Sequence, residues 1–186
     1  AGSLPPGMVR VPAGTASGSR LDDAKVGSFL IDRFEVTNRQ FKAFVDAGGY
    51  RTRRFWKEAF TQDGRVLPWD EATRAFRDST GQPGPSTWAE GTYASGHDKD
   101  PVGGVSWFEA SAYAEFAGKR LPSVYHWQRA ASPGWFSEIL EYSNFNGTGP
   151  APVGSYRGLG AYGTLDMAGN VKEWCWNASG ELRYLL

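Results

Sequence analysis

Two acidic residues, Asp166 and Glu173, bracket a Gly-Asn turn, Gly169-Asn170, near the C-terminal end of the 186-residue chain. The turn leads into a Trp-Cys-Trp run at residues 174–176. Because glycine takes backbone conformations that other residues avoid, a tight turn here can bring both carboxylates and the intervening carbonyls together. A hard cation such as Ca²⁺ prefers oxygen ligands of this kind, and indoles beside them can anchor the loop in a core. The segment therefore predicts a loop that wraps a cation and is held by buried tryptophans.

The composition indicates one globular domain with little regular secondary structure. The chain has 24 glycines, 8 tryptophans and 15 % aromatic residues, which favours irregular segments packed around large rings over disorder. Its 20 basic and 20 acidic residues cancel, so charge gives no reason to expect binding to nucleic acid or to an anionic membrane. No apolar run approaches the roughly 20 residues of a membrane span.

The cell compartment stays open. The first six residues lack the basic start and the apolar stretch of a signal peptide. An extracytoplasmic location in a bacterium is one option that the sequence leaves.

Cysteine and histidine are scarce. Cys175 is the one cysteine, so no intrachain disulfide can form, and we interpret it as a small buried hydrophobe. His97 and His126 are too few for a histidine-rich metal centre. They lie in unrelated contexts, one in a polar loop and one in an expected helix, which favours surface or hydrogen-bonded core histidines over metal ligands.

Local patterns predict four helices and several short strands. Two helices have capping boxes, Thr37 with Gln40 and Ser106 with Glu109, in which a hydroxyl and an acid or amide three residues on exchange hydrogen bonds with backbone amides. Glycines end both helices. The expected helices are 37–47, a short one within 70–76, 106–117 and 123–131, and the expected strands are 8–12, 26–31, 151–156, 171–176 and 182–186.

Residues 50–100 are interpreted as a long insertion fixed in place by tryptophans. At its start, Arg51, Arg53 and Arg54 stand beside Trp56. These side chains could bind an anionic or aromatic ligand through charge-assisted hydrogen bonds and stacking. The commoner alternative is a solvated basic face whose aromatic residues turn inward.

Several segments, in order along nearly the whole chain, resemble the formylglycine-generating enzyme family, also called the sulfatase-modifying factor domain. The segments are residues 8–14, 34–38 with Phe41, 101–107 with 112–114, 119–123 with Trp127 and 130–131, 152–155, and 162–174. The resemblance implies an α+β fold of the C-type-lectin-like type with low regular secondary structure. The sequences of residues 169–177 and of Val124-Tyr125-His126-Trp127 are most similar to the branch of the family that is fused to bacterial protein kinases.

The resemblance also implies metal sites. One family calcium site corresponds to Asp166, the carbonyls of Gly169 and Val171, and Glu173. A weaker second calcium site corresponds to Asn144 and the carbonyl of Phe145, and its remaining ligands have no clear counterpart. From the residues alone, Asp166 could instead cap a turn and Glu173 could pair with a basic residue.

Copper belongs to the oxidases of this family, which use a cysteine pair near their C-terminus. The pair is not among these 186 residues, so we expect the family's C-terminal segment to lie beyond Leu186 and no catalytic residue to be assignable within residues 1–186. The resulting hypothesis is a calcium-stabilised lectin-like binding or sensory domain for a protein or small-molecule ligand. The alternative is an oxidoreductase of the formylglycine-generating or related nonheme iron class, with copper or iron, whose catalytic end lies beyond Leu186. A last strand with an open edge would also allow pairing with another chain.

Overall fold

The computed structural model describes residues 3–18, 21–131, 140–145, 147–179 and 182–186. The chain forms two compact units. The first comprises Ala1–Glu35, Pro122–Cys175 and Leu186, and the second comprises Val36–Leu121 and Trp176–Leu185. No helix in the described part is long and apolar enough to cross a membrane.

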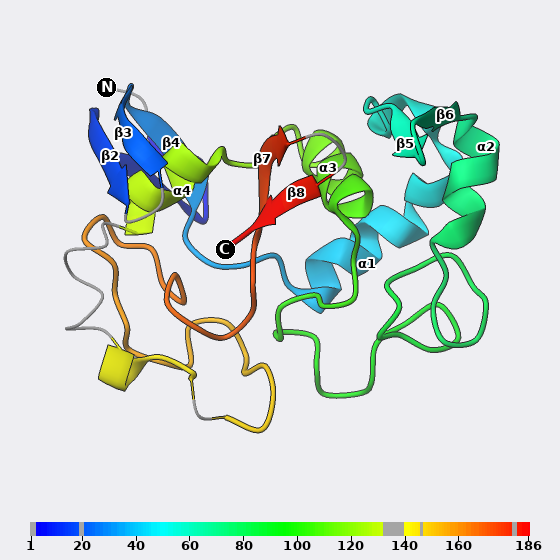
Figure 1. Ribbon diagram of the computed structural model, residues 1–186. Coiled ribbons are helices and arrows are strands. Elements are labelled where there is room, and N and C mark those ends of the chain that lie inside the picture. The colour runs from blue at the N-terminus through cyan, green and yellow to red at the C-terminus, as the bar shows by residue number, and fades with distance from the viewer. Residues whose placement is uncertain (1–2, 19–20, 132–139, 146, 180–181) are drawn as a thin grey trace. The chain divides into compact units, whose positions relative to one another are not determined.

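The first unit packs two antiparallel strand pairs with one helix. Strand β1 (Met8–Val11) pairs with β4 (Phe29–Asp32), and β2 (Gly14–Gly18) pairs with β3 (Leu21–Val26). Helix α4 (Val124–Ala131) lies against β2 and β3, and long loops follow it (Figure 1). A one-turn 3-10 helix, η5 (Leu140–Tyr142), interrupts these loops. The core consists of apolar side chains from β1, α4, the last loop and the start of β7 (Trp174–Ser179): Val11, Val124, Trp127, Ala130, Ala131, Met167 and Cys175.

A close approach between β2 and α4 depends on Gly14. A Cβ atom at this position would lie 2.6 Å from the guanidinium group of Arg129 on α4. The Arg129 guanidinium also lies over the ring of Tyr162, 4.7 Å from its centroid. Gly14 therefore lets the strand backbone pass directly over a cation–π pair that ties α4 to the loops.

The second unit is built around helices α1 (Asn38–Asp46) and α3 (Trp107–Phe116). Short elements connect and flank them. They are η1 (Gly49–Arg51), η2 (Arg53–Phe55), β5 (Phe60–Gln62), β6 (Arg65–Leu67), α2 (Trp69–Ala72), η3 (Thr73–Ala75) and the hairpin of β7 (Trp174–Ser179), whose first two residues belong to the first unit, with β8 (Leu182–Leu185). Between β5 and β6, Asp63 and Gly64 both have positive φ, at 51° and 73°, as a tight two-residue hairpin turn requires.

Aromatic rings fill the core of this unit. Phe44 of α1 is fully buried and packs against six rings, on Phe41, Tyr50, Phe55, Trp56, Tyr113 and Phe116. A Cβ atom on Gly49 would lie 2.2 Å from the Phe44 ring, so the backbone turn after α1 closes directly on it. Short elements thus pack around one ring cluster instead of around a sheet.

The long insertion is ordered by a few buried polar contacts. Trp88 is 2 % exposed, and its indole Nε1 donates to Asn38 Oδ1 at 3.0 Å. The buried Asp78 carboxylate accepts hydrogen bonds from the backbone amides of Thr80, Gln82 and Gly91. These contacts replace a regular hydrogen-bond ladder and confirm that tryptophan anchors this segment.

The structure confirms both capping boxes and corrects several strand predictions. Residues 151–156 form turns instead of a strand, and Gly154 has a φ of 72° there. The expected strand 26–31 is split, because β3 ends at Val26 and β4 begins at Phe29. The expected strand 171–176 begins only at Trp174, since the preceding residues belong to the acidic loop. The hairpins β2–β3 and β5–β6 are additional.

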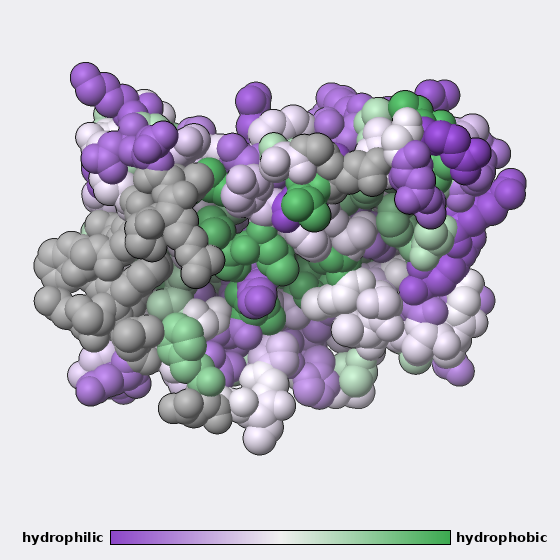
Figure 2. Space-filling view, viewed as in Figure 1, coloured by the Kyte–Doolittle hydropathy of each residue, from purple (hydrophilic) through white to green (hydrophobic). Residues whose placement is uncertain are grey.

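Strand β8 carries exposed apolar side chains, including Leu182, Tyr184 and Leu185. Figure 2 shows hydrophobic surface in the area that β8 occupies in Figure 1. Within the described residues, β7 is its sheet neighbour, in a two-stranded sheet. Pairing of β8 with another chain stays a prediction.

The aromatic core predicts a large effect of one truncation. Phe44→Ala should lower the free energy of unfolding by about 3–5 kcal/mol, because it removes a fully buried ring and leaves a cavity. Val66 is 68 % exposed, so Val66→Ala should change stability by no more than about 0.5 kcal/mol. Urea denaturation of both variants measures the difference. Equal free energies of unfolding for the two variants would show that the ring cluster around Phe44 does not stabilise this unit.

Candidate functional site

Asp166 and Glu173 lie in the first unit, and the carboxylate of each accepts a hydrogen bond. Asp166 Oδ2 accepts from the amide of Gly154 at 2.7 Å, and Glu173 Oε2 accepts from the Trp127 indole at 2.5 Å. The backbone of Glu173 also exchanges two hydrogen bonds with Leu186, at 2.6 and 3.0 Å. These two acids therefore connect the turn at Gly154, helix α4 and Leu186, the residue that follows β8.

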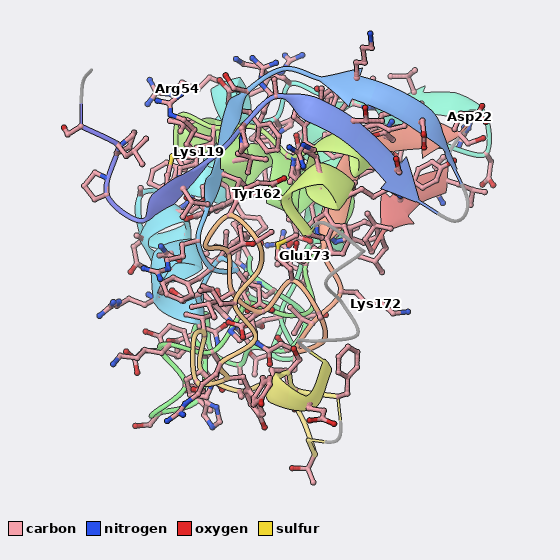
Figure 3. The ribbon with its side chains drawn as sticks, turned by 90° about the vertical axis from the view of Figure 1, so that its left-hand side faces the viewer. Asp22, Arg54, Lys119, Tyr162, Lys172 and Glu173 are labelled. Atoms are coloured by element: carbon pink, nitrogen blue, oxygen red, sulfur yellow. The ribbon has the colours of Figure 1, made fainter. Side chains whose placement is uncertain are left out.

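The side chains of the loop alternate between inside and outside. Figure 3 shows Lys172 reaching away from the ribbon, whereas the neighbouring Glu173 lies within it. Lys172 is exposed and Glu173 is half-buried. The acid at 173 is thus directed inward by the path of the chain.

A third carboxylate, Glu35, joins these two. Its Oε2 accepts from the Asn170 side-chain amide at 3.0 Å. Its Oε1 is buried and has no hydrogen-bond partner among the residues that the structure describes. Sequence reasoning missed Glu35, because it follows β4 and stands more than a hundred residues from the acidic loop.

The backbone of the loop is held in unusual conformations. Asp166 and Asn170 have positive φ, at 63° and 59°, and Gly169 has 88°. A Cβ atom on Gly169 would lie 2.7 Å from the carbonyl oxygen of Asn144. These φ values confirm the predicted tight Gly-Asn turn, and the close approach to Asn144 requires glycine at position 169. Non-glycine residues in the left-handed region carry strain and are commonest at functional sites.

Asn144 belongs to the same network. Its side-chain amide donates to the Gly149 carbonyl at 2.9 Å and to Asn170 Oδ1 at 3.0 Å. Its backbone carbonyl accepts from the Asn170 amide at 3.0 Å. Phe145, the other residue of the weaker calcium site, is 53 % exposed. The structure therefore brings Asn144 to the acidic loop, and the second site stays a prediction.

Burial makes this group of acids hard to ionise. Burial raises the pKa of Glu35 to about 9, with added repulsion from Glu173 and Asp166. Burial raises the pKa of Glu173 to about 7, although the hydrogen bond from Trp127 lowers it in part. It also raises the pKa of Asp166 against the opposing hydrogen bond from Gly154. None of the three forms an ion pair with a described basic side chain, so a cation would offset a real electrostatic cost.

The acids alone do not make a complete metal site. In the described part of the chain, no three His, Cys, Asp or Glu side chains are grouped so that they could hold a metal ion. A cation at this loop therefore needs backbone carbonyls as further ligands. Calcium accepts such ligands readily, whereas zinc and copper favour nitrogen and sulfur.

The remaining candidates from the sequence, Arg51, Arg53, Arg54 and Trp56, belong to the second unit. Trp56 is buried, donates its indole hydrogen to the Gly49 carbonyl at 2.9 Å and stacks on Phe76. The three arginines, Arg51, Arg53 and Arg54, are exposed. The structure thus agrees with a solvated basic face whose aromatic residue turns inward. The buried Trp56 ring and the exposed arginines do not form one ligand-binding surface.

The cysteine is buried, and each of the two histidines contacts a neighbouring polar side chain. Cys175 is fully buried, and burial, with repulsion from Glu173, raises the pKa of its thiol to about 12. That environment confirms a small buried side chain and disfavours a reactive thiolate. His97 Nδ1 lies 2.6 Å from Asp100 Oδ2, and His126 Nδ1 lies 2.6 Å from Ser123 Oγ.

Comparison with known proteins identifies the family. The sequence profile of the sulfatase-modifying factor enzyme 1-like domain matches residues 2–184. The chain belongs to this family. It is 33 % identical over 227 residues to the formylglycine-generating enzyme of Thermomonospora curvata, covering 92 % of this chain and 72 % of that protein.

Two other relatives contain the matching segment within a longer protein. The hercynine oxygenase of Mycolicibacterium thermoresistibile is 37 % identical over 171 residues, covering 80 % of this chain and 35 % of the oxygenase. The serine/threonine-protein kinase pkn1 of Chlamydia caviae is 34 % identical over 157 residues, covering 80 % of this chain and 22 % of the kinase. The chain thus spans about a third of the oxygenase and less of the kinase.

A solved structure supports the fold. The crystal structure of CarF aligns with a TM-score of 0.53 at 20 % identity, covering 96 % of this chain and 84 % of CarF. At that identity the likeness concerns the fold alone. The mixed helix and strand architecture of the family agrees with the expected α+β class.

The buried acids predict an unusual pH dependence without metal. Because the folded-state pKa of Glu35 is raised to about 9, its stabilising contribution is complete below the unfolded pKa near 4.5 and is lost as the pH rises toward 9. In the presence of a chelator, the melting temperature should fall between about pH 5 and about pH 8, and Glu35→Gln should flatten that fall. The exposed Glu141 provides the control, because Glu141→Gln should leave the profile unchanged. Identical profiles for wild type and Glu35→Gln would refute the assignment.

Proposed function

We propose that this chain is the sulfatase-modifying-factor-type domain of an oxidoreductase and that calcium holds its acidic loop. The observation that carries the proposal is the similarity to a formylglycine-generating enzyme over 92 % of this chain and 72 % of the enzyme. The hercynine oxygenases add a second group of redox enzymes that contain this domain. Enzymatic chemistry therefore accounts for the relatives better than a purely lectin-like role does.

The residues present do not fit the copper site that the family resemblance implies. A thiolate copper site of that kind needs two cysteines, whereas this sequence has Cys175 alone, buried and with a raised thiol pKa. Copper or iron would have to be held mainly by residues other than those described.

Calcium fits the described residues better. Asp166 and Glu173 offer carboxylate oxygens, and Gly169 and Val171 offer carbonyls in a turn. Glu35 adds a buried oxygen that has no hydrogen-bond partner in the described part of the chain. The raised pKa values of the three acids would fall again with a cation nearby. Calcium in this role supplies rigidity, and the C-type-lectin-like arrangement of the loops belongs to the same proposal.

A second candidate function is a binding or sensory module. The similarity to the Chlamydia caviae kinase favours it, because the matching segment there is a minor part of a signalling protein. In that role the loops would present a surface to a protein or small-molecule ligand without chemistry. Both candidates share the calcium-held loop and differ in whether a substrate is turned over.

Calcium binding predicts a specific stabilisation. A ligand that binds only the folded state stabilises it, by about 2.7 kcal/mol at a hundred times its Kd. The melting temperature should rise with millimolar Ca²⁺ over the value in chelator, and Asp166→Asn or Glu173→Gln should abolish the rise. Asparagine tolerates the positive φ of position 166, and Glu141→Gln should keep the full response. Equal melting temperatures with Ca²⁺ and with chelator would remove the calcium site.

Turnover separates the two functions. The natural protein that carries this sequence, supplied with copper or iron under air, should oxidise either a cysteine-containing sulfatase peptide or hercynine, as detected by mass spectrometry. Product from either substrate supports the oxidoreductase and identifies its class. Absence of product from both, with the calcium response intact, would contradict it in favour of the binding module.

A further inference from the structure

The second unit contains a solvent-open cavity of about 370 Å³ that none of the functions above uses. Its lining comes from three separate segments: residues 75–77 at the end of η3, the turn 84–86, and residues 104–109 at the start of α3. The volume falls at the lower end of the roughly 300–1,000 Å³ of small-molecule sites. A ligand of amino-acid size suits it.

The anionic group of this cavity is Glu109. The residue is 3 % exposed, and its Oε1 accepts from the Tyr50 hydroxyl at 2.5 Å while Oε2 accepts from the Ser106 amide at 2.7 Å. A carboxylate offers about four acceptor positions. Glu109 is therefore held in place by two donors and retains capacity for the N–H groups of a ligand.

The cationic group is Arg77. Its Nε donates to the backbone carbonyl of Arg74 at 3.2 Å. Within the described part of the chain, its guanidinium forms no ion pair, with Glu109 or with another acid. A cation and an anion thus line one cavity without neutralising each other.

Close contacts hold other residues of the cavity lining in place. Phe76 stacks on Trp56 with ring centroids 5.4 Å apart and planes 9° from parallel. The amide and hydroxyl of Ser86 both donate to the Gly104 carbonyl, at 2.8 and 3.0 Å. A Cβ atom on Gly104 would lie 2.6 Å from the Ser86 hydroxyl, so the two segments meet as closely as glycine allows. Such preorganisation lowers the entropy cost of binding.

We propose that this cavity binds a free α-amino acid, with the ammonium group at Glu109, the carboxylate at Arg77 and the side chain against Phe76. A simple anion would meet the Glu109 carboxylate, and a simple cation would meet the Arg77 guanidinium. A zwitterion satisfies both, and each mismatched charge acts against the wrong ligand. The positive end of α3 is already occupied by its own capping box, which leaves Arg77 as the carboxylate anchor.

The test begins with the common L-amino acids, each added at the same concentration to the full chain and followed by ¹H–¹⁵N chemical-shift changes. At least one should give saturable shifts among the lining residues. Its decarboxylated amine and its deaminated acid should each bind about tenfold weaker or less, because each loses one charge-assisted contact. Lack of saturable shifts with any amino acid would overturn the proposal, as would an amine that binds as tightly as its parent amino acid.

Two variants test the roles of the charged groups. Arg77→Gln should weaken amino-acid binding about tenfold while leaving binding of the amine unchanged. Arg74→Gln is the matched control, since Arg74 faces Asp70 at 3.7 Å and does not line the cavity. Glu109→Gln should keep the capping box, which accepts glutamine, and should lose the preference for the ammonium group. Unchanged melting temperatures establish that each variant folds, and equal binding by Arg77→Gln and Arg74→Gln would reject the site.

Discussion

The hydrogen bond from the Trp127 indole to Glu173 connects most of the first unit. Trp127 belongs to α4 and lies in the core of the unit, and Glu173 directly precedes β7. Through this contact, a loop with almost no regular hydrogen-bond ladder is joined to helix α4, which supplies four residues of the core. The acid that accepts this hydrogen bond also interacts electrostatically with Glu35 and Asp166. Stability and the candidate metal site therefore depend on the same contact.

Local signals in the sequence were sufficient for the helices and insufficient for the strands. Both capping boxes involve residues three positions apart, so the sequence displays them directly. The β2–β3 hairpin has no such signal, because β2 reads Gly-Thr-Ala-Ser-Gly and lacks alternating apolar residues. Residues 151–156 show the reverse error, since a short apolar pattern there belongs to a turn whose Gly154 amide serves Asp166.

The acidic loop was predictable only in part. Asp166, Gly169 and Glu173 stand close together in sequence, and the turn between them has a composition typical of cation-binding loops. Glu35 comes from the end of the first strand pair and reaches the loop through Asn170. No spacing rule links positions 35 and 170, so a single sequence cannot show that contact. Glu35, which the sequence analysis did not identify, is also the residue whose buried Oε1 has no hydrogen-bond partner among the described residues. It is therefore the residue that says most about a bound cation.

The two units show how partners decide what a buried acid can do. Glu109 is more deeply buried than Glu35, and burial raises its pKa, yet Tyr50 and Ser106 donate to both of its oxygens. Neutral donors stabilise its charge, so the capping box is complete without a cation. Glu35 also has hydrogen-bond donors, the Asn170 side chain and the Val171 backbone, but burial and two neighbouring carboxylates outweigh them and raise its pKa. A bound cation would therefore offset the cost of burial and the repulsion among the acids of the first unit. Glu109 of the second unit needs no cation for its stability, so the ammonium group of a ligand would use the acceptor positions that Tyr50 and Ser106 leave.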